Sequence, residues 1–298
     1  MRVNPQYLTN VASAIDQTTS VEQQLTEELS SGISVQRLSD NPSAAGQNVQ
    51  LNSAIQLDDQ YQQTASSAQG MLQVTDSTLG SVVTQLTSAI SLATEGNNGT
   101  LNSSNEQSIA TQLSGIRDEV LSLANTAYLG QYLFSGSVKT APFSLDTSTS
   151  PATVTYHGDS AVNTVTTPDG QSIALNLPGD QIFTASGGNV LGALNQLIAD
   201  YSSGNITAAQ ADSGQLSAAL NYVSQQRVAI DNSLSRITAT STYAQTQSTQ
   251  LQSTQTDLMQ ADIAGISTQL KNAETQQAAL SQVFAVLGGN SLFNDLSH

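Results

Sequence analysis

Apolar and small residues recur every three or four positions along most of this chain, which is the spacing of a helix that buries one face. One such run extends from Tyr61 to Ala93. Asn41 and Pro42 mark its expected start, because both residues favour the first turn of a helix, and Gly96 marks its expected end. The helix would hold about 54 residues and measure about 80 Å, far more than a usual globular helix. The pattern therefore predicts a long rod.

A second run extends from Ile109 to Phe134 and predicts a helix that folds back on the first. Ser104 and Gln107 have the spacing of a capping box at its start, and Gly136 is its expected end. For both internal helices, the simplest interpretation is that the apolar stripe is the core of their own bundle.

The second half of the chain predicts two more helices in the rod. A short one covers Leu191–Tyr201 and is expected to end at Gly204, and a long one follows a capping box formed by Thr207 and Gln210. The long run continues through residues 243–256, which are rich in Gln, Thr and Ser and hold few apolar core positions. Antiparallel coiled-coil packing suits these stripes.

Both ends of the chain carry amphipathic stripes, the first closed by Gly32 and the last beginning near Gly265. The last stripe is apolar over more than half of its helix, so pairing of the two ends cannot cover all of it. Exposed apolar surface of this kind is typical of assembly sites. We expect these helices to order fully only when neighbouring subunits cover them. The predicted interface residues are Leu8, Val11, Ile15, Leu25, Leu29, Ile263, Ile266, Leu270, Leu280, Phe284 and Leu287.

Between Val138 and Gly188 the apolar period changes from 3.6 to 2. Ala152–Tyr156 and Ser172–Leu177 alternate as strands do, and turns rich in Gly, Pro and Asp separate them. The predicted fold is therefore mainly α: an elongated antiparallel helical coiled-coil rod with a terminal helix pair and a small inserted β domain. Its predicted parts are the terminal pair (1–40 and 259–298), the rod (41–137 and 189–258) and the β domain (138–188).

Composition narrows the possible chemistry. The 298 residues include seven Lys and Arg against 23 Asp and Glu, a net charge of −16. Seven scattered cations cannot form the basic patch that nucleic-acid binding needs. The absence of Cys removes disulfides, thiolate nucleophiles and Cys metal ligands. No run of 18 apolar residues occurs, and the first residues lack the apolar core of a secretory signal. We therefore expect no membrane insertion and, for an extracellular protein, export without a cleaved signal peptide.

Candidate catalytic and metal-binding residues are few. His157 lies in an expected turn and His298 at the end of the chain, without a carboxylate cluster at ligand spacing. The adjacent carboxylates Asp58 and Asp59 point to different sides of a helix, and we interpret them as solvent-facing. Neither a P-loop nor a dinucleotide-binding glycine motif occurs. We expect no catalytic residue, no cofactor and no metal ion, and hence no enzyme.

Several motifs resemble the flagellin-like family. Leu29–Ile33 followed by Leu38–Gly46 resembles the signature near the N-terminus of flagellins and their relatives, and Ala261–Ala264 resembles the matching C-terminal element. Three further stretches are more similar to the branch of flagellar hook-associated protein 3, found at the hook-filament junction, than to flagellin. These stretches are Asn125–Ser137, Tyr156–Asp159 and Pro178–Phe183.

The resemblance implies a secreted structural protein of the bacterial flagellum. Such a protein is held by a cytoplasmic flagellar export chaperone and passes unfolded through the flagellar type III export channel. It polymerises at the hook tip as an adaptor, with hook-associated protein 1, flagellin and copies of itself as partners. Its terminal helices line the central channel, and its β domain points outward.

Two alternatives stay open. A flagellin-type filament subunit belongs to the same structural class, although the short central insert and the ending Gly288–Leu296 depart from the flagellin pattern. A secreted coiled-coil adhesin or translocator is a more distant alternative, because such a protein would not need matching helices at both termini.

Overall fold

The computed structural model describes residues 5–97 and 102–295, except for the side chains of Pro5, Leu8 and residues 287–295. The chain forms two compact units, one of residues 1–56 and 248–298 and the other of residues 57–247. The mainly α fold with a small β region is confirmed.

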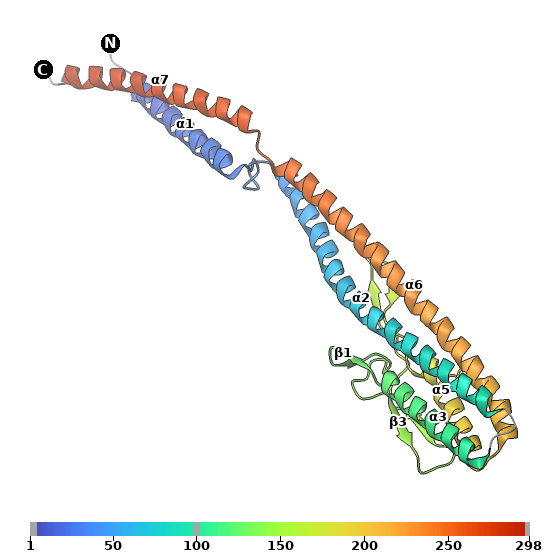
Figure 1. Cartoon of the computed structure of the whole chain (residues 1–298). Helices are drawn as coiled ribbons and strands as arrows, with labels where there is room; N and C mark the ends of the chain where they lie inside the picture. The colour runs from blue at the N-terminus through green and yellow to red at the C-terminus, as the bar shows by residue number, and fades with distance from the viewer. Residues whose placement is uncertain (1–4, 98–101, 296–298) are drawn as a thin grey trace. The chain divides into compact units, whose positions relative to one another are not determined.

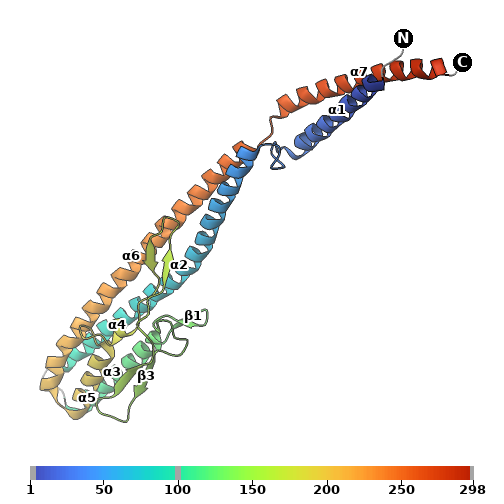
Figure 2. The same ribbon diagram turned by 180° about the vertical axis from the view of Figure 1, so that it is seen from behind.

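In the first unit, helix α1 (Pro5–Ser31) and helix α7 (Ile263–Asp295) lie side by side (Figures 1 and 2). They pack through a small cluster of buried side chains and two half-buried leucines. The cluster consists of Leu25, Ala261, Ile266 and Ala273, with Leu29 and Leu270 at its edge. The Gln277 amide lies 3.0 Å from the Thr19 hydroxyl and adds a polar contact between the helices.

The N-terminal and C-terminal motifs of the chain meet where α1 ends and α7 begins. Gly32 has φ +71°, a left-handed conformation that stops α1 and that side chains disfavour. The Gly32 carbonyl then accepts a hydrogen bond from Ala261 N at 2.9 Å, and Ser34 N donates to Met259 O at 2.8 Å. Asp262 Oδ1 accepts from Gly265 N at 3.1 Å in the first turn of α7. These contacts set the entry points of both terminal helices.

Two long helices, α2 (Pro42–Gly96) and α6 (Ile206–Met259), run side by side in both views (Figures 1 and 2). The second unit is built on their residues 57–96 and 206–247. Arg227 Nε donates to Asp76 Oδ1 at 2.5 Å between them, and the Tyr61 and Thr240 hydroxyls form another bridge. Helices α3 (Ser103–Ala124) and α5 (Val190–Ser203) pack on each other and join the same core. Fully buried core side chains include Leu72, Leu79, Leu86, Leu113, Leu194 and Leu216.

The β region consists of three antiparallel pairs of short strands. Strand β1 (Ala127–Tyr128) pairs with β2 (Gln131–Tyr132), β3 (Phe143–Asp146) with β4 (Thr153–Tyr156), and β5 (Thr164–Thr166) with β6 (Ser172–Ala174). A short helix, α4 (Asp180–Phe183), follows. Phe183 joins this region to the core, because its ring packs edge-on against Phe134 at 5.2 Å and against Phe143 at 5.4 Å.

Two predictions about helix termini are confirmed. Helix α2 begins at Pro42, and the Asn41 Oδ1 accepts from Ala44 N at 3.1 Å, as expected of an N-cap. Its 55 residues agree with the predicted length. The short helix α5 ends at Gly204, which takes the left-handed conformation with φ +72°.

Three predictions about helices were wrong. Helix α3 ends at Ala124, not at Gly136, because the chain turns back at Leu129 and Gly130, which both have positive φ and connect β1 to β2. The residues that cap α3 and α6 are Asn102 and Asn205, whose Oδ1 atoms accept from Asn105 N at 2.9 Å and Ala208 N at 3.2 Å. Each helix therefore starts earlier than the predicted capping boxes, Ser104 with Gln107 and Thr207 with Gln210.

The two strands that we predicted from alternation are present as β4 and β6, although β6 is three residues shorter than expected. Strands β3 and β5 and the β1–β2 hairpin had not been predicted. These segments hold two to four residues each.

Candidate assembly surface

The structure divides the predicted interface residues into three groups. Val11, Leu25 and Ile266 are buried, and Ile15, Leu29, Leu270 and Leu280 are half-buried. Ile263 and Phe284 are exposed, at 47% and 41% of their surface. The side chains of Leu8 and Leu287 lie outside the described residues. Leu25 and Ile266 thus hold α1 to α7, whereas Ile263 and Phe284 are open to solvent.

Further apolar side chains are exposed on the same two helices. Val21 on α1 and Val283 and Val286 on α7 are exposed. Val21 was missed because it lies beside the spacing of three and four residues that leads from Ile15 to Leu25. We use the name terminal apolar surface for the exposed residues Val21, Ile263, Val283, Phe284 and Val286.

Charge is absent from much of this part of α7. From Thr275 to Val286 the sequence has no Asp, Glu, Lys or Arg. The desolvation of ionised groups is the largest cost of burying a surface. Covering this stretch with another protein would not carry that cost.

Hydroxyl groups on both terminal helices bond to their own backbone. Thr18, Thr19 and Thr26 on α1 donate to the carbonyl four residues earlier, at 2.7 to 2.9 Å. Ser267 and Thr268 on α7 do the same at 2.7 and 3.0 Å. These donors would remain paired if a neighbouring molecule covered them, so the polar residues do not oppose burial.

His157, which directly follows β4, has its Nε2 2.7 Å from Ser144 Oγ on β3, whereas His298 lies outside the described residues. Asp58 is 2% exposed, which corrects its interpretation as solvent-facing. It occupies a core position of α2, three residues before the buried Tyr61. Burial, and to a lesser degree the neighbouring Asp59 carboxylate, raises the pKa of Asp58.

Residues 5–97 and 102–295 contain no group of three or more His, Asp or Glu side chains that could hold a metal ion. In the same ranges no helix is long and apolar enough to cross a membrane.

Asp200, at the end of α5, is the second buried carboxyl whose charged form is disfavoured. Burial raises its pKa, and the neighbouring Asp212 carboxyl raises it further, whereas Gln196 Nε2, which donates to Asp200 Oδ1 at 3.2 Å, opposes the rise. A raised pKa in the folded state means that the protein is destabilised as the pH rises from the unfolded Asp value of about 3.9 through the folded value.

We therefore expect the substitution Asp200→Asn to stabilise the unit of residues 57–247. The amide keeps the shape, can still accept from Gln196 and can donate to Asp212. The free energy of unfolding at pH 7 should rise by about 1 kcal/mol, and the gain should shrink as the pH is lowered to 4. Urea titrations followed by circular dichroism at both pH values measure this effect. The exposed carboxyl variant Glu119→Gln is the control, and an equal gain at both pH values would contradict the assignment.

The sequence has counterparts among known proteins. Residues 3–139 match the family model described as the bacterial flagellin N-terminal helical region. Over 169 residues the chain is 33% identical to flagellar hook-associated protein 3 of Salmonella typhimurium, and this alignment covers 56% of this chain and 51% of that protein. Over 120 residues it is 38% identical to the protein of the same name from Escherichia coli, covering 40% of this chain and 38% of that protein.

The chain is similar to flagellar hook-associated protein 3. This similarity confirms the resemblance to the flagellin-like family that the motifs indicated. The alignments span about half of the length of the Salmonella protein and less of the Escherichia protein.

The fold also has a counterpart among solved structures. A structure of a flagellar hook-associated protein from Vibrio parahaemolyticus matches 74% of this chain and 100% of its own, with a TM-score of 0.66 and 24% identity. The region that matches the flagellin model contains α1, α2 and α3 and thus one side of the terminal helix pair.

Proposed function

We propose that this chain is a non-catalytic structural component of the bacterial flagellum, an adaptor at the hook-filament junction that links hook-associated protein 1 to the flagellin filament. The observation that carries the proposal is the sequence similarity to two proteins named flagellar hook-associated protein 3. The terminal apolar surface supports it, because a subunit that polymerises needs a surface that neighbouring copies can cover.

In this proposal the chain has three parts with separate tasks. The terminal pair, 1–40 and 259–298, lines the channel and assembles, the helical part, 41–137 and 189–258, spaces the subunits, and the β domain, 138–188, faces outward. Binding partners are hook-associated protein 1, flagellin and further copies of the chain. Two different lattices meet at a junction, so the contacts between copies are head-to-tail and not those of a closed two-fold dimer.

Export through the flagellar channel is also part of the proposal. A cytoplasmic export chaperone would mask the terminal apolar surface before secretion and prevent early polymerisation. The small cluster between α1 and α7 supports this idea, since four buried side chains and two half-buried ones give the pair only modest stability.

Deleting the gene for this chain should leave hooks intact and remove filaments. We expect electron microscopy to show bare hooks, motility assays to show non-motile cells, and immunoblots to show flagellin in the culture medium. The full chain supplied from a plasmid should restore all three. Filaments that remain attached in the deletion strain would refute the junction role.

A flagellin-type filament subunit is the second candidate, because the matched family model is that of the flagellins. Purified chain mixed with filament seeds distinguishes the two. A filament subunit would extend the seeds into long filaments, whereas a junction adaptor would stop after a limited assembly.

A further inference from the structure

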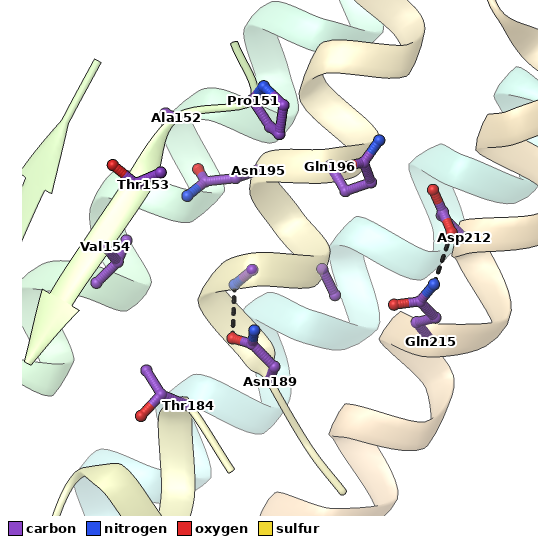
Figure 3. Close-up of a pocket in the computed structure, with 12 residues that line it drawn as sticks. Pro151, Ala152, Thr153, Val154, Thr184, Asn189, Asn195, Gln196, Asp212 and Gln215 are labelled. Carbon is purple, nitrogen blue, oxygen red and sulfur yellow. Dashed lines mark hydrogen bonds between the residues drawn. The ribbon is translucent and has the colours of Figure 1, made fainter. Parts of the chain in front are cut away.

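A cavity of about 530 Å³ lies between β4, α5 and the first turns of α6 (Figure 3). This volume is in the range of about 300–1,000 Å³ that is usual for binding sites. Threonine, amide and small apolar side chains dominate its described lining, in which Asp212 is the one charged residue. Gln215 Nε2 donates to Asp212 Oδ1 at 2.7 Å. The lining thus suits an uncharged, hydrogen-bonding occupant.

Asn195 contributes an unpaired hydrogen-bond donor to this cavity. Its side chain is 2% exposed, and its amide points from α5 towards the segment that carries Thr153 (Figure 3). Asn195 Oδ1 accepts from Arg117 Nη1 at 3.5 Å, but its Nδ2 has no partner among the described residues. A buried donor without a partner destabilises the folded chain, and an incoming carbonyl oxygen would satisfy it.

The strand next to Asn195 has a free edge. His157 N donates to Pro142 O at 2.7 Å, so these two residues form a hydrogen-bonded pair of the antiparallel β3–β4 ladder. Hydrogen-bonded pairs alternate with pairs that form no such bonds. The backbone N–H and C=O groups of Thr155 and Thr153 therefore also point towards β3, whereas those of Val154 point to the outer edge of β4. Neither backbone group of Val154 has a hydrogen-bond partner within residues 5–97 and 102–295. Val154 also lines the cavity.

A second free edge lies on β5. Leu175 N donates to Asn163 O at 2.8 Å, so the same alternation turns the backbone groups of Thr164 and Thr166 away from β6. Neither residue has a backbone partner on that side in the described part of the chain. The segment from Asn163 to Thr167 carries no charge, although the chain has a net charge of −16.

The outer edges of β3 and β6 are partly occupied. Asn125 pairs with both backbone groups of Phe143, at 2.9 Å each. Arg236 Nη2 donates to Ser172 O at 3.4 Å. Among these four strands, β4 and β5 are therefore the two with open outer edges.

We propose that the outer edge of β4, together with the adjoining cavity, binds the outer edge of β5 from a second copy of this chain. The incoming strand would pair with the N–H and C=O of Val154 by strand addition, and one of its carbonyls would accept from Asn195 Nδ2. Neither edge carries a charged side chain, and Asp212 is the one charged residue of the cavity lining, so local repulsion between two acidic copies is small here. The contact joins two different surfaces and therefore continues from copy to copy. This inference depends on the proposed function in one respect, which is that self-assembly brings the copies together.

Cysteine cross-linking tests this contact directly, because the chain contains no Cys. The variants Thr153→Cys and Thr166→Cys are purified separately, mixed at high concentration and treated with a short bis-maleimide. Both positions are exposed. We expect at least about ten times more linked dimer than in a control mixture of Thr153→Cys with Thr111→Cys, an exposed position on α3. Linking at the level of the control would overturn the proposal.

A proline at the free edge provides the second test. Val154→Pro removes an N–H that the β3–β4 ladder does not use, so the strand pair should persist. We expect linking between the two Cys positions to fall to the control level while circular dichroism stays unchanged. If Val154→Pro does not fold, Thr164→Pro on the partner edge serves the same purpose. Undiminished linking in a folded proline variant would overturn the proposal, whatever phenotype the gene deletion shows.

Discussion

Phe284→Asp should abolish incorporation of the chain into the flagellum while the unit of residues 57–247 stays folded. Phe284 is 41% exposed and lies outside the buried cluster between α1 and α7. Its replacement therefore removes little from the monomer. In an assembled interface the carboxylate would be buried in a stretch of α7 without charged residues, at a cost of several kcal/mol per contact. A loss of 3 kcal/mol already weakens each contact more than 100-fold.

The variant is tested by its ability to rescue the deletion strain. We expect non-motile cells with flagellin in the medium, although the secreted protein is present and circular dichroism of the purified variant is close to that of the original chain. Phe284→Leu, which keeps an apolar side chain, should rescue motility. Thr111→Asp adds the same charge on exposed α3 and should also rescue. Normal rescue by Phe284→Asp would show that the terminal apolar surface is not an assembly interface.

Phe183→Ala should lower the free energy of unfolding of the 57–247 unit by about 3–5 kcal/mol. Phe183 is fully buried, and its ring lies against Phe134 and Phe143. The alanine would leave a cavity where α4, β3 and the segment after β2 meet. Urea unfolding followed by circular dichroism measures the loss, which should appear as a lower midpoint with an unchanged slope.

Leu129→Ala is the matched control for this core substitution. Leu129 is 89% exposed at the turn of the β1–β2 hairpin, so the same kind of truncation should change the stability by no more than about 0.5 kcal/mol. A loss below 1 kcal/mol for Phe183→Ala would show that the aromatic cluster does not hold the β region to the helices.

Much of the helical part could be predicted because its signals are local. Apolar spacing identified α2, α5 and α6, and Asn41 and Pro42 identified the start of α2. The same signals failed after Ala124. The apolar spacing continued to Phe134 by coincidence, while the positive φ of Leu129 and Gly130 had already turned the chain into a hairpin. A Leu at such a position gives no warning in the sequence, because side chains other than Gly and Asn rarely adopt it.

The sequence by itself determined the long helices and the pairing of the two ends, since apolar periodicity and capping residues act within a few neighbouring positions. Only the tertiary structure decided which apolar residues of the terminal helices remain exposed. Ile266 and Phe284 belong to one helical stripe and look equivalent in sequence, yet Ile266 is buried in the cluster with Leu25 and Phe284 is exposed. The free edges of β4 and β5 were likewise decided by distant residues, because whether a strand edge is paired depends on which segments fold beside it.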